Sequence, residues 1–150
     1  MARLQIDGGC HCGKIGYEAN VDPANVIICH CTDCQANSGA PYRANVLVKA
    51  ENFKLRGQPS TYVKTADSGN RRLLAFCSDC GSALYSTTVE DPRIYNVRLG
   101  SVNQRAQLTP RAQGFCRSAM PWAMDIRNIP QLPDPPAASS SPRRAARGRG

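Results

Sequence analysis

Cysteine is the residue type whose number and spacing most clearly indicate chemistry in this chain. The sequence of 150 residues holds 8 Cys and 2 His. Seven of the cysteines fall into three short clusters, and the eighth, Cys116, stands alone. The clusters are Cys10-His11-Cys12, Cys29-His30-Cys31-Thr32-Asp33-Cys34 and Cys77-Ser78-Asp79-Cys80-Gly81. In a chain that we expect to stay in a reducing compartment, such clusters are typical of metal ligands or catalytic groups rather than of disulfides.

Zinc is the metal that this set of thiols fits best, because it binds thiolate readily and takes four ligands in a tetrahedron. Residues two apart on a strand share a face, so a Cys-x-Cys pair can reach one ion. The intervening residues, His11 and His30, would then point away, and we expect neither to be a ligand. The third cluster resembles a zinc knuckle, in which Gly81 permits the positive φ that turns backbone N–H groups toward the sulfurs.

The count of thiols suggests two metal sites of different kinds. Two pairs make a closed site of four thiolates, which is typical of structural zinc, whereas a triplet leaves one position open, which is typical of catalytic zinc. The closed site would consist of Cys10, Cys12, Cys77 and Cys80, and the open site of Cys29, Cys31 and Cys34. The spacing does not force this division.

Several other arrangements of the cysteines stay open at this stage. One zinc ribbon with spare thiols, two four-thiolate sites that use Cys116, structural zinc throughout, an iron–sulfur cluster and a set of disulfides are all compatible with the count. Cys116 follows Gly114-Phe115, and we expect it to be a small core residue, with Trp122 as a core anchor. Asp33 and Gln35, beside the triplet, are expected to orient bound groups or to cap the turn.

Short apolar runs separated by Gly, Pro, Asn and Asp must position these cysteines, and such runs are typical of strands. We expect turns at Gly8-Gly9, Gly57-Gln58-Pro59 and Asp67-Ser68-Gly69-Asn70, and a helical turn or two only at Thr32–Asn37. The expected strands are residues 3–6, 14–19, 26–29, 43–48, 53–56, 61–64, 72–76, 83–89 and 94–99. The sequence therefore predicts a mainly β domain, in which metal ions staple short strands together.

Charge divides the chain into a body and a basic tail. The formal net charge is +8, and residues 127–150, with 5 Arg and 1 Asp, supply +4 of it. That segment also holds 5 of the 11 Pro and few apolar residues, so we expect a disordered tail over 127–150 after a single domain over 1–126. The remaining +4 on the body suits a small anionic substrate more than a nucleic-acid interface.

Location and partners follow from what the sequence lacks. No run approaches the roughly 20 apolar residues of a membrane span, and no basic and apolar leader precedes the patterned sequence. We therefore expect a cytoplasmic protein with no membrane partner. The Arg/Gly-rich end has no interleaved aromatic residues for base stacking, so we expect at most weak contact of the tail with nucleic acid.

The motifs, taken together, resemble those of the glutathione-dependent formaldehyde-activating (GFA) family, which also includes centromere protein V. The resemblance covers residues from about 5 to about 126. It is specific because three cysteine clusters and two further landmarks occur in the same order. The matching segments are Gly9-Cys10-His11-Cys12-Gly13, Cys29-His30-Cys31-Thr32-Asp33-Cys34-Gln35 with Ser38-Gly39, Phe76-Cys77-Ser78-Asp79-Cys80-Gly81-Ser82, Arg98-Leu99-Gly100-Ser101 and Pro121-Trp122.

This resemblance implies a compact fold of coiled antiparallel β-sheets stapled by zinc. It implies a structural zinc on Cys10, Cys12, Cys77 and Cys80, and a second zinc with an open position on Cys29, Cys31 and Cys34. It also implies the family's named activity, S-(hydroxymethyl)glutathione synthesis by a carbon–sulfur lyase, with glutathione as the thiol and formaldehyde as the aldehyde. By charge alone, the candidates for binding the carboxylates of glutathione are Arg43, Arg71, Arg72 and Arg117.

Chemistry at the triplet leads to one hypothesis and two alternatives. Zn²⁺ with three thiolates carries a formal charge of −1, which weakens it as a Lewis acid but still lets it hold an incoming thiol as thiolate. We expect that thiol to add reversibly to a small aldehyde and form a hemithioacetal. The alternatives are a non-catalytic zinc-stapled binding module, whose tail contacts nucleic acid or an acidic partner, and a redox or metal-handling protein.

Overall fold

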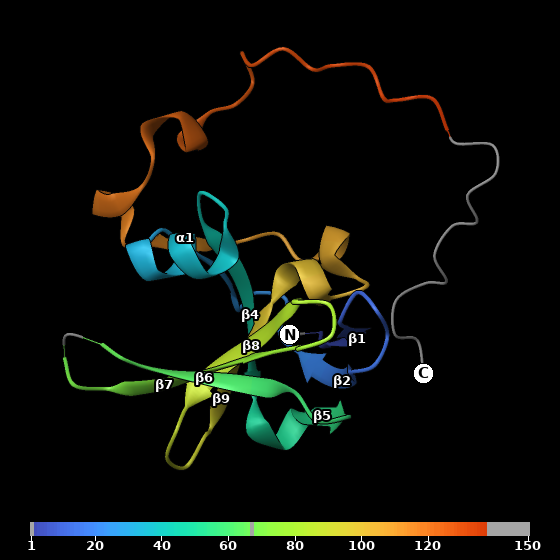
Figure 1. Cartoon of the computed structure of the whole chain (residues 1–150), viewed down its shortest axis with the longest axis vertical. Coiled ribbons are helices and arrows are strands. Elements are labelled where there is room, and N and C mark those ends of the chain that lie inside the picture. Colours follow the sequence, from blue (N-terminus) through green and yellow to red (C-terminus); the bar gives the residue numbers. More distant parts are fainter. Residues whose placement is uncertain (1, 67, 138–150) are drawn as a thin grey trace.

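Strands dominate the computed structural model of the chain, which describes residues 2–66 and 68–137. Ten strands form two sheets, one with the order β1-β2-β5 and one with the order β10-β3-β4-β9-β8-β7-β6. Neighbouring strands are antiparallel except for β10, which pairs with β3 in parallel. The strands are β1 (Leu4–Gly9), β2 (Gly16–Val21), β3 (Val26–Cys29), β4 (Arg43–Lys49), β5 (Phe53–Arg56), β6 (Ser60–Thr65), β7 (Arg71–Phe76), β8 (Ala83–Thr88), β9 (Ile94–Arg98) and β10 (Ala112–Gly114). The prediction of a mainly β fold is confirmed (Figure 1).

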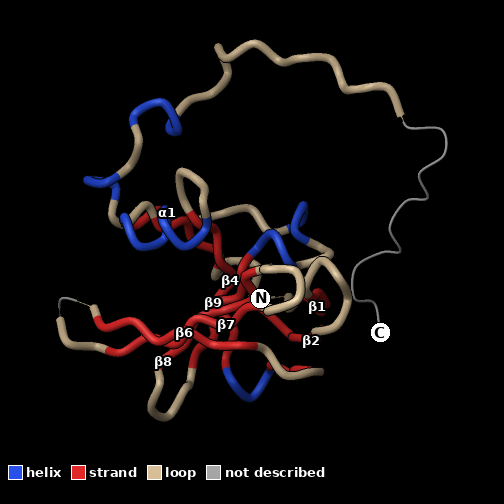
Figure 2. The backbone as a smooth tube through the Cα atoms, in the orientation of Figure 1, coloured by secondary structure: helices blue, strands red, loops and turns tan. Residues whose placement is uncertain are grey.

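Helical structure is confined to short pieces. The α-helix α1 (Thr32–Ser38) begins after Cys31, whose side chain caps its first turn, and ends at Gly39 in the left-handed conformation, with φ of 67°. Gly39 suits that position because it has no Cβ to clash there. The remaining turns are 3₁₀ helices at Ala50–Asn52, Leu99–Ser101, Arg105–Gln107, Cys116–Ser118 and Pro121–Met124. As Figure 2 shows, α1 lies on one side of the larger sheet.

Alternation along the strands gives the larger sheet two unlike faces. On β4, Val46 and Val48 are fully buried in the hydrophobic core, together with Val97 of β9 and residues of the smaller sheet. The residues that alternate with them along β4, such as Arg43 and Asn45, belong to the opposite face. The core therefore lies between the two sheets, and the second face of the larger sheet carries polar side chains toward α1.

Aromatic rings join the two sheets within that core. Phe53 of β5 stacks on Tyr95 of β9, with ring centroids 4.9 Å apart, and also contacts Tyr17 and Tyr85 at 5.4 Å. The Tyr17 hydroxyl hydrogen-bonds with the Ser101 hydroxyl at 2.7 Å, both groups being buried. Buried phenol groups need such partners, and this pair fixes β2 against the turn that follows β9.

The expectation of a turn at Gly8-Gly9 was wrong, because β1 runs through both residues and the turn follows at residues 11–15. Instead, the two glycines let the backbone of β1 lie close to neighbouring backbone segments, where a side chain would not fit. A Cβ on Gly8 would lie 2.2 Å from the Ser101 carbonyl oxygen, and one on Gly9 would lie 2.3 Å from that of Ile15. Strand β10 had no counterpart among the expected strands.

The expectation that Cys116 and Trp122 belong to the core was also wrong. Cys116 is exposed, and Trp122 retains 54% of its surface exposure. After β10 the chain pairs with no further strand among the described residues, so the apolar side chains that follow have little to pack against. Exposed apolar residues here include Phe115, Met124 and Ile126.

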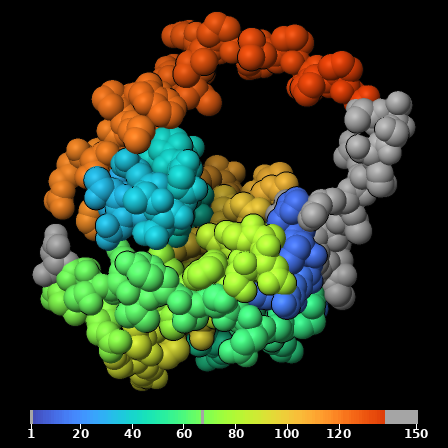
Figure 3. All heavy atoms as spheres, viewed as in Figure 1, coloured from blue at the N-terminus to red at the C-terminus, as the bar shows by residue number. Residues whose placement is uncertain are grey.

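The predicted tail lies largely beyond the described part of the chain. Residues 127–137 contain neither helix nor strand, and their side chains are exposed. They run away from the two sheets, as the orange and red atoms of Figure 3 show. The remainder of the expected disordered tail, residues 138–150, lies outside the described residues, as does Asp67 of the expected turn between β6 and β7. Within the described residues, no helix is both long and apolar enough to cross a membrane.

Candidate metal centres

Four cysteines from two distant loops meet beside the smaller sheet. Cys10 and Cys12 lie in the loop after β1, and Cys77 and Cys80 lie in the loop between β7 and β8. Their sulfur atoms all lie within 4.8 Å of one another. The Sγ atoms of Cys12 and Cys77, 65 residues apart in the sequence, are separated by 3.7 Å. The structure therefore places in one group the four thiols of the expected closed site.

Backbone hydrogen bonds hold the two loops in this position. In the second loop, Gly81 N–H donates to the Cys77 carbonyl at 2.7 Å, with Gly81 at φ of 78°. This is the positive φ that the zinc-knuckle interpretation requires. Between the loops, His11 N–H donates to the Ser82 hydroxyl at 2.9 Å, and Lys14 forms a 2.8 Å ion pair with Asp79. His11 thus contributes a backbone contact, while Cys10 and Cys12 occupy a turn and not the extended strand assumed from the sequence.

The donor set of this group fits a divalent metal. Burial disfavours ionisation of Cys80, but hydrogen bonds from the Ser82 hydroxyl and backbone outweigh it and lower the pKa of Cys80 to about 5. Four thiolates crowded into such a space repel one another unless a cation lies among them. Four thiol ligands with no carboxylate among them are the donor set that zinc takes in structural sites.

The second group is the triplet Cys29, Cys31 and Cys34, whose sulfur atoms also lie within 4.8 Å of one another. Cys29 ends β3, and Cys34 lies in the first turn of α1. Cys31 is the N-cap of α1, and its sulfur accepts a hydrogen bond from Cys34 N–H at 3.3 Å. The turn from strand to helix therefore brings three sulfurs together within six residues of sequence.

The closeness of the three thiols also changes how readily they ionise. Burial raises the pKa of Cys34 to about 12, and hydrogen bonds and charge interactions with the Cys29 and Cys31 thiols add to the rise. Without a cation, the site therefore keeps a proton on Cys34 at neutral pH. A divalent metal would compensate the charge of all three thiolates, so this donor set too fits a soft or borderline cation.

Side chains around α1 fix the triplet against the C-terminal part of the fold. The Gln35 amide donates to the carbonyl oxygens of His30 and Ser118, at 2.8 and 2.9 Å. The His30 ring is buried and hydrogen-bonds through Nε2 to Gln113 Oε1 of β10 at 2.8 Å. Gln35 and Asp33 were expected to orient bound groups or to cap the turn. Gln35 instead holds the helix in place, and the Asp33 carboxylate forms an ion pair with Lys64 at 2.5 Å.

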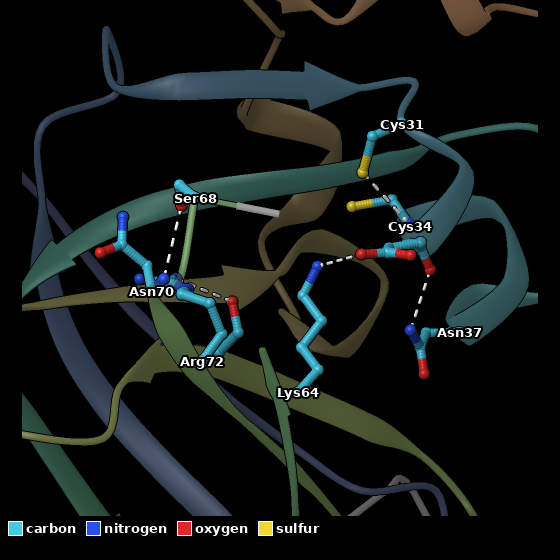
Figure 4. Close-up of polar contacts among 9 residues, drawn as sticks. Cys31, Cys34, Asn37, Lys64, Ser68, Asn70 and Arg72 are labelled. Carbon is cyan, nitrogen blue, oxygen red and sulfur yellow. Dashed lines mark hydrogen bonds and ion pairs between the residues drawn. The ribbon is translucent and has the colours of Figure 1, made fainter. Parts of the chain in front are cut away.

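The sulfurs of the triplet open onto a cavity of about 360 Å³ between α1 and the polar face of the larger sheet. Figure 4 shows Cys31 and Cys34 facing this space from one side and Lys64 reaching into it from β6. Phe115, just after β10, forms part of the wall. The lining residues are Ile27, Cys29, Cys31, Asp33, Cys34, Asn37, Arg43, Asn45, Lys64, Arg72, Leu74, Ser86, Asn96, Arg98 and Phe115.

Strand register explains why so many polar residues line this cavity. Cys29 of β3 pairs directly with Arg43 of β4, and Asn45 of β4 pairs with Arg98 of β9. Partners in register share a face of the sheet, so the strands carry their polar residues to the same side. Burial and the nearby Arg43 charge lower the pKa of Arg98 to about 9, but a guanidinium group stays protonated at neutral pH.

The four arginines proposed from charge alone divide into two sets. Arg43 and Arg72 line the cavity. Arg71 points elsewhere and forms an ion pair with Glu90 at 3.0 Å, and Arg117 lies over the exposed Phe115 ring. Two further cations of the cavity, Lys64 and Arg98, were not among the residues predicted to bind substrate. Arg98 was noted only as the first residue of the Arg-Leu-Gly-Ser landmark. The alternation of side chains along β6 and β9 is the signal that could have assigned both residues to the cavity face.

Comparison with known proteins settles the family. The family model of the glutathione-dependent formaldehyde-activating enzyme, GFA, matches residues 5–118. This chain belongs to the GFA family. The match spans both cysteine groups and the ten strands apart from Leu4 of β1, so family membership supports an enzyme with cysteine-bound metal.

A solved structure supports the fold of this GFA-family chain. The crystal structure of a Rhodobacter sphaeroides protein, determined by a structural genomics consortium, superposes with a TM-score of 0.54 at 19% sequence identity. The alignment covers 71% of this chain and 98% of the bacterial protein. At this identity the likeness bears on the arrangement of the strands alone.

Proposed function

We propose that this GFA-family chain is a zinc-dependent carbon–sulfur lyase-type enzyme that adds a thiol reversibly to a small aldehyde. In this proposal, Cys10, Cys12, Cys77 and Cys80 hold a structural zinc, and Cys29, Cys31 and Cys34 hold the zinc at the reaction site. Glutathione and formaldehyde, the pair named in the family's description, are the first substrates to test. The observation that carries the proposal is a triplet of thiols that opens onto a cavity.

The two cysteine groups differ in the way that this proposal needs. The group of four offers as many protein ligands as a tetrahedral zinc ion takes, and two of its members, Cys10 and Cys77, are buried. The group of three offers one ligand fewer and faces a cavity large enough for a small molecule. Structural zinc sites are closed and catalytic zinc sites keep a position for the substrate.

The chain's own residues supply the charge balance for a thiol substrate. When bound, zinc would supply a cation that keeps an incoming thiol deprotonated near neutral pH. Arg43, Arg72 and Lys64 face the same cavity, and their positive charge favours a negatively charged group there. In the addition, the sulfur forms a bond to the carbonyl carbon, the carbon–oxygen π bond breaks, and the oxygen ends with the proton that the thiol has lost.

Metal analysis tests the foundation of the proposal. Elemental analysis of the wild-type chain is expected to give about two zinc ions, and Cys31→Ser is expected to lower that number to about one while the far-ultraviolet circular dichroism stays unchanged. Cys116→Ser is the matched control, because Cys116 is exposed and belongs to neither group. One zinc in both the wild type and Cys31→Ser would remove the chemical basis of the proposal.

A direct assay tests the reaction. Carbon-13 NMR with labelled formaldehyde and glutathione follows the approach to hemithioacetal equilibrium, which the zinc-loaded wild type is expected to accelerate. Cys34→Ser is expected to abolish the acceleration, and Cys116→Ser to retain it. An unchanged rate in Cys34→Ser would refute the role of the triplet.

A further inference from the structure

Two buried arginines beside the triplet have no carboxylate partner among the described residues. Arg43 and Arg98 keep only 5% and 8% of their surface exposure. Within residues 2–66 and 68–137, no carboxylate lies within ion-pair distance of Arg43, Arg98 or Arg72. Asp33, the acidic residue that lines the cavity, is paired with Lys64. Buried arginine charge without a carboxylate is an arrangement that proteins avoid unless an anion completes it.

Hydrogen-bonding capacity is also left over on these arginines. Arg98 donates from one Nη to Asn45 Oδ1 at 2.8 Å, but its buried Nε has no partner. Arg72 donates to the Ser86 hydroxyl at 3.1 Å. A guanidinium has five N–H donors in a planar fork, which matches the two oxygens of a carboxylate. The lowered pKa of Arg98, caused by burial and by the Arg43 charge, agrees with a site that gains stability when an anion enters.

A count of charge in the cavity indicates how many negative charges are needed. The lining residues carry four positive side chains, Arg43, Lys64, Arg72 and Arg98, and one negative side chain, Asp33. Three thiolates with Zn²⁺ contribute one further negative charge, which leaves an excess of two positive charges. One substrate thiolate and one carboxylate would neutralise that excess.

We propose that Arg43, Arg72 and Arg98 form a carboxylate subsite, and that the substrate pair handled at the triplet includes a small molecule with a carboxylate a few bonds from its reacting atom. The closeness follows from register, because Arg43 is the direct strand partner of Cys29, and directly paired residues have Cβ atoms only about 5 Å apart. A cavity of about 360 Å³ also suits a small acid.

The carboxylate can belong to either reactant. It can lie on the thiol, as in mercaptoacetate, or on the aldehyde, as in glyoxylate, and the recognition chemistry is the same. The placement of this carboxylate beside a reacting atom rests on the proposed function, whereas the anion subsite itself rests on the three arginines. Binding and turnover therefore test the two ideas separately.

Isothermal titration calorimetry on the full-length, zinc-loaded chain tests the subsite. Two matched pairs are titrated at fixed ionic strength: mercaptoacetate against 2-mercaptoethanol, and glyoxylate against glycolaldehyde. Inorganic phosphate is titrated as a third anion. In at least one pair we expect the acid to bind tenfold or more tightly than its neutral analogue, as loss of charge-assisted hydrogen bonds would give. The pair that shows the preference identifies the reactant that carries the carboxylate.

Adjacent arginines on one strand provide the control. Arg72→Met removes a cation of the cavity, and we expect it to weaken binding of the acid about tenfold or more without changing binding of the neutral analogue. Arg71→Met removes the same charge from the other side of β7, where Arg71 pairs with Glu90, and should leave both affinities unchanged. Arg98→Lys keeps the charge but loses the fork, and should give an intermediate loss. Zinc content is measured for each variant to show that the site has formed.

Three outcomes overturn the carboxylate subsite: equal affinities within both pairs, tighter binding of phosphate than of either acid, or equal losses in Arg71→Met and Arg72→Met. These outcomes leave the proposed function standing if hemithioacetal formation is still catalysed. Conversely, acid binding that depends on Arg72, without any catalysis of addition by the same protein, supports the subsite and refutes the proposed function.

Discussion

Loss of one ligand from the four-cysteine group should destabilise the whole domain, and Cys12→Ser is the perturbation that shows it. A metal ion that joins Cys12 to Cys77 closes a loop of 65 residues. By analogy with a disulfide, closing a loop of that length removes about 14.5 cal/mol/K of unfolded-chain entropy, or about 4 kcal/mol at 25 °C. This is a large share of the roughly 5–15 kcal/mol by which small domains are stable.

Thermal unfolding followed by circular dichroism measures this effect on zinc-loaded protein. A loss of about 4 kcal/mol corresponds to a fall in Tm of about 10–20 °C for a domain of this size. Cys116→Ser, which changes an exposed thiol outside both groups, should leave the Tm within about 2 °C of wild type. The reasoning is refuted if Cys12→Ser unfolds within a few degrees of wild type, or if Cys116→Ser falls as far.

Three further predictions concern the core, the anchoring of α1 and the ionisation of the triplet. Leu84→Ala should lower the free energy of unfolding by about 2–5 kcal/mol in urea titration, because Leu84 is fully buried and truncation leaves a cavity; a loss below 1 kcal/mol would contradict the packing described. Gln35→Leu should weaken zinc binding at the triplet, because it removes the two hydrogen bonds from the Gln35 amide that hold α1. A competition with a chromophoric chelator measures this. Asn37→Ala, the control, removes one exposed hydrogen bond and should leave zinc binding unchanged. The zinc affinity of the triplet should fall as the pH is lowered from 8 to 6, by about tenfold per pH unit for each proton that zinc displaces. The reason is that the pKa of Cys34 is raised to about 12, so zinc uptake must remove the proton of this thiol. A zinc affinity that does not change with pH in the same chelator assay would refute this.

Local spacing explains why the sequence predicted the grouping of the cysteines. Cys29, Cys31 and Cys34 lie within one short turn, so their spacing almost determines their distances. For the group of four, two local pairs were each identifiable, and the family resemblance joined them across the chain. The structure places the sulfurs in these two groups, and their occupation by zinc stays a prediction.

The cavity could not be predicted in the same way, because it depends on side chains from many strands. Arg98, Lys64 and Arg43 reach one space only through the register of β6, β7, β8, β9 and β4. A shift of one residue in any pairing would move a side chain to the opposite face. Charge alone therefore gave two arginines that line the cavity and two that lie elsewhere.

The errors on Gly8-Gly9, Cys116 and Trp122 also have a physical basis. A glycine pair is typical of turns, but here the absence of Cβ atoms lets β1 approach Ser101 and Ile15, a long-range contact that local patterns do not contain. Apolar residue type favours burial, yet burial needs a partner surface. The segment after β10 pairs with no further strand among the described residues, and Trp122 is left exposed.

Strand β10 has a consequence for how molecules enter the cavity. It is only three residues long, lies at the edge of its sheet and pairs with β3 alone, and it leads directly into Phe115 of the cavity wall. Short edge segments open in the lowest free-energy fluctuations of a native protein. Among the strands only β3 pairs with β10, which is otherwise held by contacts such as that of Gln113 with His30. We therefore expect β10 and Phe115 to detach while the rest of the ladder stays closed, which would widen the way into the cavity. Amide hydrogens of residues 112–115 should then exchange far sooner than those of β4 and β9.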